Sequence, residues 1–76
     1  MKVSWSPLAM EKLSHAAEFI ALDNPNAADK WVNDLFDKTD LLNHQPEIGR
    51  IVPELQKANY RELIFGHYRI IYRIST

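Results

Sequence analysis

The feature that most constrains the fold of this chain is a pair of strand-like segments near its end, residues 60–65 and 68–74. Both segments are rich in β-branched, aromatic and long aliphatic side chains, which favour strands. The two residues between them, Gly66 and His67, have the length and the glycine of a tight hairpin loop. The pattern therefore predicts an antiparallel β-hairpin.

A two-residue loop also fixes which residues of the hairpin share a face, because side chains alternate across a strand. The face that we expect to cover the core is almost entirely apolar and holds Phe65, Leu63, Tyr68, Ile70, Tyr72 and Ile74, with Arg61 opposite Tyr72. The other face mixes charged and apolar residues in the cross-strand pairs Ile64–Arg69, Glu62–Ile71 and Tyr60–Arg73. Because unpaired charges are costly to bury, we expect this second face to be solvated or to bind a partner.

Two helices are predicted ahead of the hairpin, each opened by a capping residue followed by proline. Ser6-Pro7 opens a helix from about Pro7 to Leu22, and Asn24-Pro25 opens a second helix. Apolar side chains recur every three or four residues along both, at Met10, Leu13, Ala17 and Ile20, and at Ala28, Trp31, Val32, Leu35, Phe36 and Leu42. The short turn between the helices predicts an antiparallel helical hairpin.

Two further strands are expected from shorter patterns. Residues 2–5 are typical of a first strand with Val3 and Trp5 on one face. Arg50 to Leu55 favours another strand, in which Pro53 indicates an edge, a bulge or the strand's end. We therefore expect a single domain over residues 1–76 of the α+β class, with an N-terminal strand and an antiparallel helical hairpin packed on a small antiparallel β-sheet.

Length and composition limit the classes of protein to consider. A chain of 76 residues is near the size at which one core barely suffices, so a partner or a dimer would help it. With 46% hydrophobic and 25% charged residues and no apolar run of bilayer length, it is expected to be a globular domain without a membrane span. It has no cysteine and begins with no apolar signal segment, so we expect a cytoplasmic protein without disulfides.

The charges are unevenly distributed along the chain. A net charge of −1 argues against a general nucleic-acid binder. Residues 1–48 hold four Lys and Arg against eight Asp and Glu, whereas residues 49–76 hold five against two. The hairpin half is therefore expected to present a positive field that suits a phosphate or an acidic peptide.

Few residues carry catalytic chemistry. There is no glycine-rich phosphate loop and no histidine pair at metal-ligand spacing, so no cofactor and no metal are expected. Glu54 and Glu62, together with arginines of the hairpin, have the chemistry to cleave RNA, with glutamate as base for a 2′-hydroxyl and arginine stabilising the phosphate. The same residues have the chemistry to form salt bridges across the strands. His67 is a weak acid–base candidate beside them.

Three motifs identify a family resemblance that covers nearly the whole chain. They are W-S-P-x-A at residues 5–9, N-P-x-A-A at residues 24–28, and G-R-x-V-P-E-L followed by Y-R-E-L-I-x-G-x-Y-R-I-I-Y-R-I within residues 49–74. Together they resemble the RelE/ParE superfamily of bacterial toxins from type II toxin–antitoxin modules. The resemblance implies a helical hairpin packed on an antiparallel sheet, and a cognate antitoxin that wraps the toxin with an extended or helical segment.

The family divides in function, and the resemblance implies different site residues for each branch. RelE-like members are ribosome-dependent endonucleases that act on mRNA, and the matching positions here are Arg69 and, as base, Glu54. ParE-like members act on DNA gyrase. The motifs at residues 24–28 and 49–55 are closer to the ParE-like, plasmid-stabilisation side. We therefore expect a ParE-like toxin whose binding residues are Arg50, Arg61, Glu62, His67, Tyr68 and Arg73.

The end of the sequence keeps two alternatives open. Relatives continue past the Tyr-Arg-Ile strand through a further strand and a tail with a catalytic tyrosine or histidine, whereas this sequence ends at Thr76. We therefore expect an incomplete nuclease set, and the RelE-like nuclease is the second interpretation. The third is a truncated, inactive relative that binds antitoxin or dimerises. An exposed sheet edge would suit strand addition by an antitoxin or a homodimer.

Overall fold

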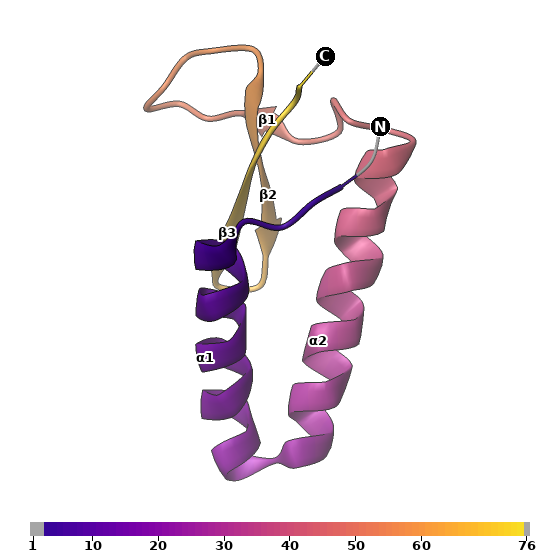
Figure 1. The fold of residues 1–76 in the computed structure, drawn as a ribbon, viewed down its shortest axis with the longest axis vertical. Helices are drawn as coiled ribbons and strands as arrows, with labels where there is room; N and C mark the ends of the chain where they lie inside the picture. The colour runs from indigo at the N-terminus through magenta and orange to yellow at the C-terminus, as the bar shows by residue number, and fades with distance from the viewer. Residues whose placement is uncertain (1–2, 76) are drawn as a thin grey trace.

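A computed structural model describes residues 3–75 of the chain. Its elements are α1 (Pro7–Asp23), α2 (Pro25–Asp40), the 3₁₀ turn η1 (Leu41–Asn43), β1 (Arg50–Ile51), β2 (Tyr60–Phe65) and β3 (Tyr68–Arg73). Two antiparallel helices lie beside a three-stranded antiparallel sheet of order β1-β2-β3 (Figure 1). This arrangement confirms the α+β class.

Both helices begin where the cap-and-proline pattern predicts. The Ser6 side chain accepts a hydrogen bond from the Ala9 backbone N–H at 3.1 Å, and the Asn24 side chain accepts one from Ala27 at 3.1 Å. Asn24 is also the C-cap of α1, because its own N–H donates to the Ile20 carbonyl at 3.0 Å. A single residue therefore closes one helix and opens the next, which forces the two helices antiparallel.

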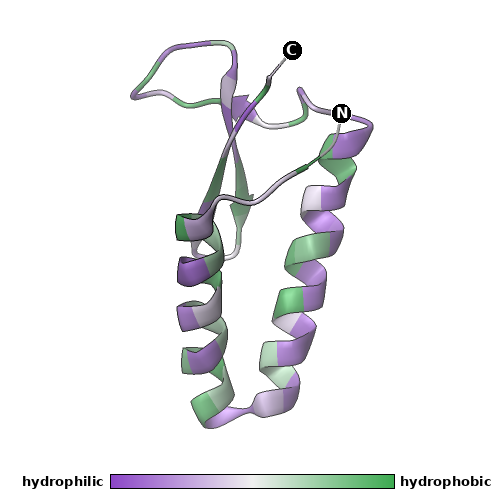
Figure 2. Cartoon of the chain, in the orientation of Figure 1, coloured by the Kyte–Doolittle hydropathy of each residue, from purple (hydrophilic) through white to green (hydrophobic). Residues whose placement is uncertain are grey.

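The helices bury their apolar sides unequally. Apolar residues of α2 lie on the side that faces α1 (Figure 2), and Ala28 and Leu35 of α2 are buried together with Leu42 of η1. No residue of α1 is buried, and Met10, expected on its core stripe, is exposed. The first helix is therefore covered on one side only.

The hairpin has the predicted register. Phe65 pairs with Tyr68, and the ladder continues to Tyr60 opposite Arg73. The side chains alternate between the two faces of the hairpin as predicted. The exposure expected for two of them is wrong. Tyr68, expected in the core, is 44% exposed because it lies at the hairpin end, and Glu62, expected on a solvated face, is 1% exposed.

The two short strands differ from expectation. β1 has only two residues, because the chain turns after it: the N–H groups of Leu55 and Gln56 both donate to the Val52 carbonyl, and Gln56 has a left-handed φ of 51°. Pro53 lies in this turn just after the strand, so of the three roles expected for it the strand's end is the one observed.

The expected N-terminal strand does not form in the described part of residues 2–5, and Lys2 lies outside the described residues. Residues 3–6, here called the N-terminal strap, run from the start of α1 across to the end of α2 (Figure 1). The Val3 N–H donates to the Asn43 side chain at 3.0 Å, and the Trp5 ring packs edge-on against Phe36 at 5.4 Å. The strap is thus fixed to the helices and not to the sheet.

The molecule is elongated, with extents of 38 × 25 × 21 Å. The helical hairpin extends past the sheet, and both described ends of the chain lie opposite the α1–α2 turn (Figure 1). Trp31 of α2 contacts the sheet, with its ring 5.9 Å from that of Phe65 and 5.3 Å from that of Tyr68 between centroids.

Candidate functional site

Four charged side chains form a row of ion pairs on the face of the sheet turned away from the helices. They are Arg50, Glu54, Glu62 and Arg69, here called the outer-face cluster. Arg50 Nε lies 2.9 Å from Glu62 Oε1, and Arg69 Nε lies 3.2 Å from Glu62 Oε2. A second nitrogen of Arg69, Nη2, lies 2.8 Å from Glu54 Oε2. Positive and negative groups alternate, so the cluster has no net charge.

Glu62 is the buried centre of this cluster. Its side chain is 0% exposed, whereas those of Arg50 and Arg69 are 67% and 41% exposed. The ladder places Glu62 opposite Arg50 of β1 on one side and Ile71 of β3 on the other, and these neighbours cover it. Oε2 of Glu62 accepts no aligned hydrogen bond, although Arg69 is close. Two guanidinium groups therefore offset the cost of burying one carboxylate.

Glu54 forms the exposed end of the cluster. The hydrogen bond from the Arg69 guanidinium is the main cause that lowers the pKa of Glu54 below its ordinary value, and a backbone N–H adds to it. The same contact raises the pKa of Arg69. Glu54 is thus an ionised ion-pair partner near neutral pH, whereas an efficient general base has a pKa near the working pH.

Arg61 lies on the opposite face and holds a loop. Its Nε donates to the Ala58 carbonyl at 3.1 Å, and its Nη1 donates to the carbonyls of Gly49 at 3.0 Å and Glu47 at 3.3 Å. The Tyr72 hydroxyl donates to the Pro46 carbonyl at 2.7 Å and accepts from the Gly49 N–H at 3.0 Å. Arg61 is therefore placed as an anchor of residues 46–49, apart from the outer-face cluster.

The remaining predicted binding residues lie at the two ends of the hairpin. His67 is exposed in the turn beside Gly66, and Tyr68 packs against Trp31 on the helix side. Arg73 is exposed at the far end of β3 and makes no ion pair among the described residues. Four of the eight predicted site residues are thus brought together, and the other four are not.

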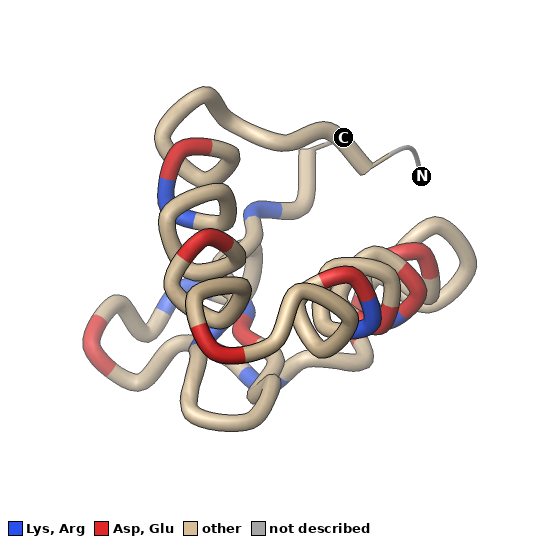
Figure 3. The backbone as a smooth tube through the Cα atoms, turned by 90° about the horizontal axis from the view of Figure 1, so that it is seen from below, with Lys and Arg blue, Asp and Glu red and all other residues tan. Residues whose placement is uncertain are grey.

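Two apolar residues beside the cluster were not singled out from the sequence. Ile64 is 53% exposed and Ile71 is 49% exposed on the same face as Arg69 and Glu62. Figure 3 shows acidic positions along both helices with basic positions among them, and further basic positions among the strands. The alternation of side chains along the strands is the sequence signal that could have identified the two isoleucines, because it places both on the charged face.

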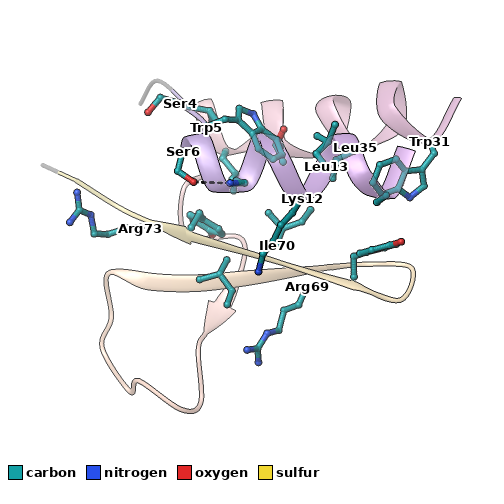
Figure 4. A pocket seen from close by; sticks show the side chains of 18 of the residues that line it. Ser4, Trp5, Ser6, Lys12, Leu13, Trp31, Leu35, Arg69, Ile70 and Arg73 are labelled. Atoms are coloured by element: carbon teal, nitrogen blue, oxygen red, sulfur yellow. Dashed lines mark hydrogen bonds between the residues drawn. The ribbon is translucent and has the colours of Figure 1, made fainter. Parts of the chain in front are cut away.

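A groove of about 820 Å³ lies between the helices and β3. Its walls come from the N-terminal strap, α1, α2 and β3, and it is mainly apolar, with Trp5, Leu13, Leu35 and Ile70 among its lining. Lys12 reaches from α1 toward the sheet, whereas Arg69 points away on the outer side (Figure 4). No sequence motif predicted this groove, because it results from the distance between α1 and the sheet.

Residues 3–75 contain no group of three His, Cys, Asp or Glu side chains placed to hold a metal ion. None of the helices in that range is long and apolar enough to cross a bilayer.

The fold and the site define a small α+β domain with a charged outer sheet face and an apolar groove along its last strand. A family model described as the ParE toxin of the type II toxin–antitoxin system parDE matches residues 3–76. Searches of curated proteins and of solved structures gave no match. Because the family match spans nearly the whole chain, the chain belongs to the ParE toxin family. A toxin of this class has an antitoxin as its partner.

Proposed function

We propose that this ParE-family toxin acts on DNA gyrase by protein contact in the bacterial cytoplasm, and that its antitoxin neutralises it. The contact surface in this proposal is the outer face of the sheet, formed by the outer-face cluster with Ile64 and Ile71. The family resemblance supports gyrase as the target, and the exposure and the charged groups of this face support it as the contact surface.

The observation that carries the proposal is the pair of exposed isoleucines beside paired charges. Ile64 and Ile71 stand among Arg50 and Arg69, which are anchored by Glu62. Apolar side chains held beside arginines are the composition that protein interfaces favour. A face built to hold a nucleic-acid backbone would leave its arginines unpaired and carry a net positive charge.

The groove suits the antitoxin. Its apolar lining would accept the apolar side of an amphipathic segment, and Lys12 and Arg73 border it with positive charge. An acidic, amphipathic segment of an antitoxin would complement both properties. Arg69, which belongs to the outer-face cluster, also lines the groove, so the two proposed surfaces meet at β3.

The experiment that tests the proposed target is a gyrase supercoiling assay with the purified chain. We expect inhibition without any loss of RNA, and we expect Ile64→Asp to weaken inhibition at least about tenfold because it places a charge in the contact. The matched control is Leu22→Asp at the far end of α1, where an exposed leucine is replaced outside the proposed surface. No inhibition at high protein excess would overturn the proposal.

A RelE-like ribosome-dependent nuclease remains a second candidate because Glu54 and Arg69 lie side by side, 2.8 Å apart. In that mechanism Glu54 would accept the 2′-hydroxyl proton and Arg69 would stabilise the phosphate. Arg69→Ala should then abolish cleavage of mRNA on ribosomes while the fold is retained. Cleavage that survives this change would remove the candidate.

The third candidate is an inactive relative that binds antitoxin as a decoy, and the open groove favours it. It predicts that expression of the chain leaves growth unchanged, while co-expression with an active toxin and limiting antitoxin increases toxicity. Growth arrest by the chain alone would exclude it.

A further inference from the structure

Arg50 of the outer-face cluster lies on a short support. Its strand, β1, has only two residues, and two residue pairs join it to β2. Arg69, by contrast, lies within the six residue pairs that join β2 to β3. Because a segment with few contacts opens easily, the position of Arg50 depends on what fixes the chain beside it.

The chain directly before β1 is held by two side chains from the other face of the sheet. Arg61 of β2 and Tyr72 of β3 lie opposite each other in the ladder, on the side that faces the helices. The Tyr72 hydroxyl accepts from the Gly49 N–H at 3.0 Å, and Arg61 donates to the Gly49 carbonyl at 3.0 Å. The hydroxyl also donates to the Pro46 carbonyl at 2.7 Å, and Arg61 to the Glu47 carbonyl at 3.3 Å. Both backbone groups of Gly49 are therefore bonded by side chains.

Gly49 connects this anchor to Arg50, the next residue along the chain. A Cβ on Gly49 would lie 2.6 Å from the Glu62 carbonyl oxygen, so the anchored segment packs directly on the backbone of β2. The Arg50 side chain extends to the outer face, where its Nε lies 2.9 Å from Glu62 Oε1. Because consecutive Cα atoms are about 3.8 Å apart, a fixed Gly49 limits where the backbone of Arg50 can lie.

We propose that Arg61 and Tyr72 are positioning residues for Arg50, and that they fix from the helix side the backbone from which Arg50 reaches a partner on the outer face. The part that concerns gyrase rests on the proposed function. The Arg50 side chain is 67% exposed although its Nε is bonded, so the rest of the guanidinium is open to a partner. An arginine held in one place loses less conformational freedom on binding than a free one.

NMR of the folded full chain tests the positioning itself. Tyr72→Phe removes the hydroxyl and keeps the ring, and Arg61→Lys keeps the charge and loses the planar fork. In both variants we expect the Arg50 Nε–H to exchange with solvent at least about threefold faster, the effect of losing ordinary hydrogen bonds. Tyr60→Phe, which removes the hydroxyl of another tyrosine of the hairpin, is the matched control and should leave this exchange unchanged.

The amides that join β2 to β3 separate positioning from general loosening, because they should keep the exchange rates of the parent chain in both variants. If Arg50 keeps its protection in both variants, or if these amides loosen as much as Arg50 does, the proposal is wrong.

Gyrase supercoiling measures the consequence for the proposed contact. We expect Tyr72→Phe and Arg61→Lys to inhibit about three- to tenfold more weakly than the parent chain. Because the tyrosine acts through Arg50, adding Tyr72→Phe to Arg50→Ala should weaken inhibition no further. An equal loss with and without the Arg50 side chain would overturn the link between them. A parent chain that does not inhibit gyrase would overturn the proposed target, whereas the NMR result alone decides the positioning.

Discussion

At the scale of single residues, the carboxylate of Glu62 is the centre of the candidate surface. It is fully buried, yet both neighbouring arginines reach solvent, so the cluster is a buried anion held by two exposed cations. Sequence alternation predicted the face of Glu62 correctly. Its burial was beyond the sequence, because it depends on Arg50, which only the pairing of β1 with β2 brings opposite Glu62.

Replacing Glu62 by Gln should lower the free energy of unfolding by about 1–3 kcal/mol, because a buried group loses its charged partners. The decrease should stay within this range because the arginines can turn to water. Glu54→Gln, in the exposed end of the same cluster, should change stability little. Urea denaturation of the two variants measures the difference, and equal stabilities would contradict the central role of Glu62.

The carboxyl of Glu54 should titrate below its ordinary range because Arg69 stabilises the charged form. A lowered folded-state pKa means that this contact contributes stability above the unfolded-state pKa and that the contribution is lost as pH falls through the folded-state pKa. In an NMR titration, Arg69→Gln should raise the midpoint of Glu54 toward its ordinary value. An unchanged midpoint would show that Arg69 is not the cause.

At the scale of elements, local sequence patterns predicted the hairpin and the two helices. They did not predict where the short strands begin and end. Gly66-His67 fixes the register of β2 and β3, and Asn24-Pro25 fixes the helical hairpin. The strand expected over residues 2–5 does not form in its described part, residues 3–5, because strand propensity needs a partner strand and Val3 instead bonds Asn43. Such long-range partners leave no local pattern.

The two glycines offer a matched test of why each is needed. A Cβ on Gly49 would lie 2.6 Å from the Glu62 carbonyl oxygen and 2.7 Å from the Tyr72 hydroxyl, so Gly49→Ala should cost about 1–3 kcal/mol through overpacking. Gly66 has open space and a φ of +60°, so Gly66→Ala should cost only about 1–2 kcal/mol of backbone strain. Thermal unfolding of the two variants measures these costs, and hydrogen exchange should show loosening of residues 46–49 in the first variant alone.

At the scale of the whole molecule, a thin core and an open groove make this domain dependent on few contacts. Among the described residues the buried apolar side chains are Ala28, Leu35, Leu42, Val52 and Leu63. The chain can bury little more by itself at this size, and a ligand that binds only the folded state would raise its stability. The groove was not predictable from periodicity, because the helix pattern identifies an apolar side without saying how well it is covered.

Trp31 links the helical layer to the sheet through its ring contacts with Phe65 and Tyr68. Trp31→Ala should lower the free energy of unfolding by about 3 kcal/mol and expose the hairpin to hydrogen exchange. Phe19→Ala, on the exposed side of α1, should change stability little. If both variants unfold alike, the two layers are held together elsewhere.

The measurement that tests the central claim most directly is inducible expression of the chain in bacteria, with DNA and protein synthesis followed together by pulse labelling. Action on gyrase predicts that DNA synthesis stops first, with DNA damage signalling, while translation continues, and that co-expressed antitoxin restores both. Arrest of translation before DNA synthesis would contradict the proposed target and make Glu54 and Arg69 the first residues to test as a nuclease pair.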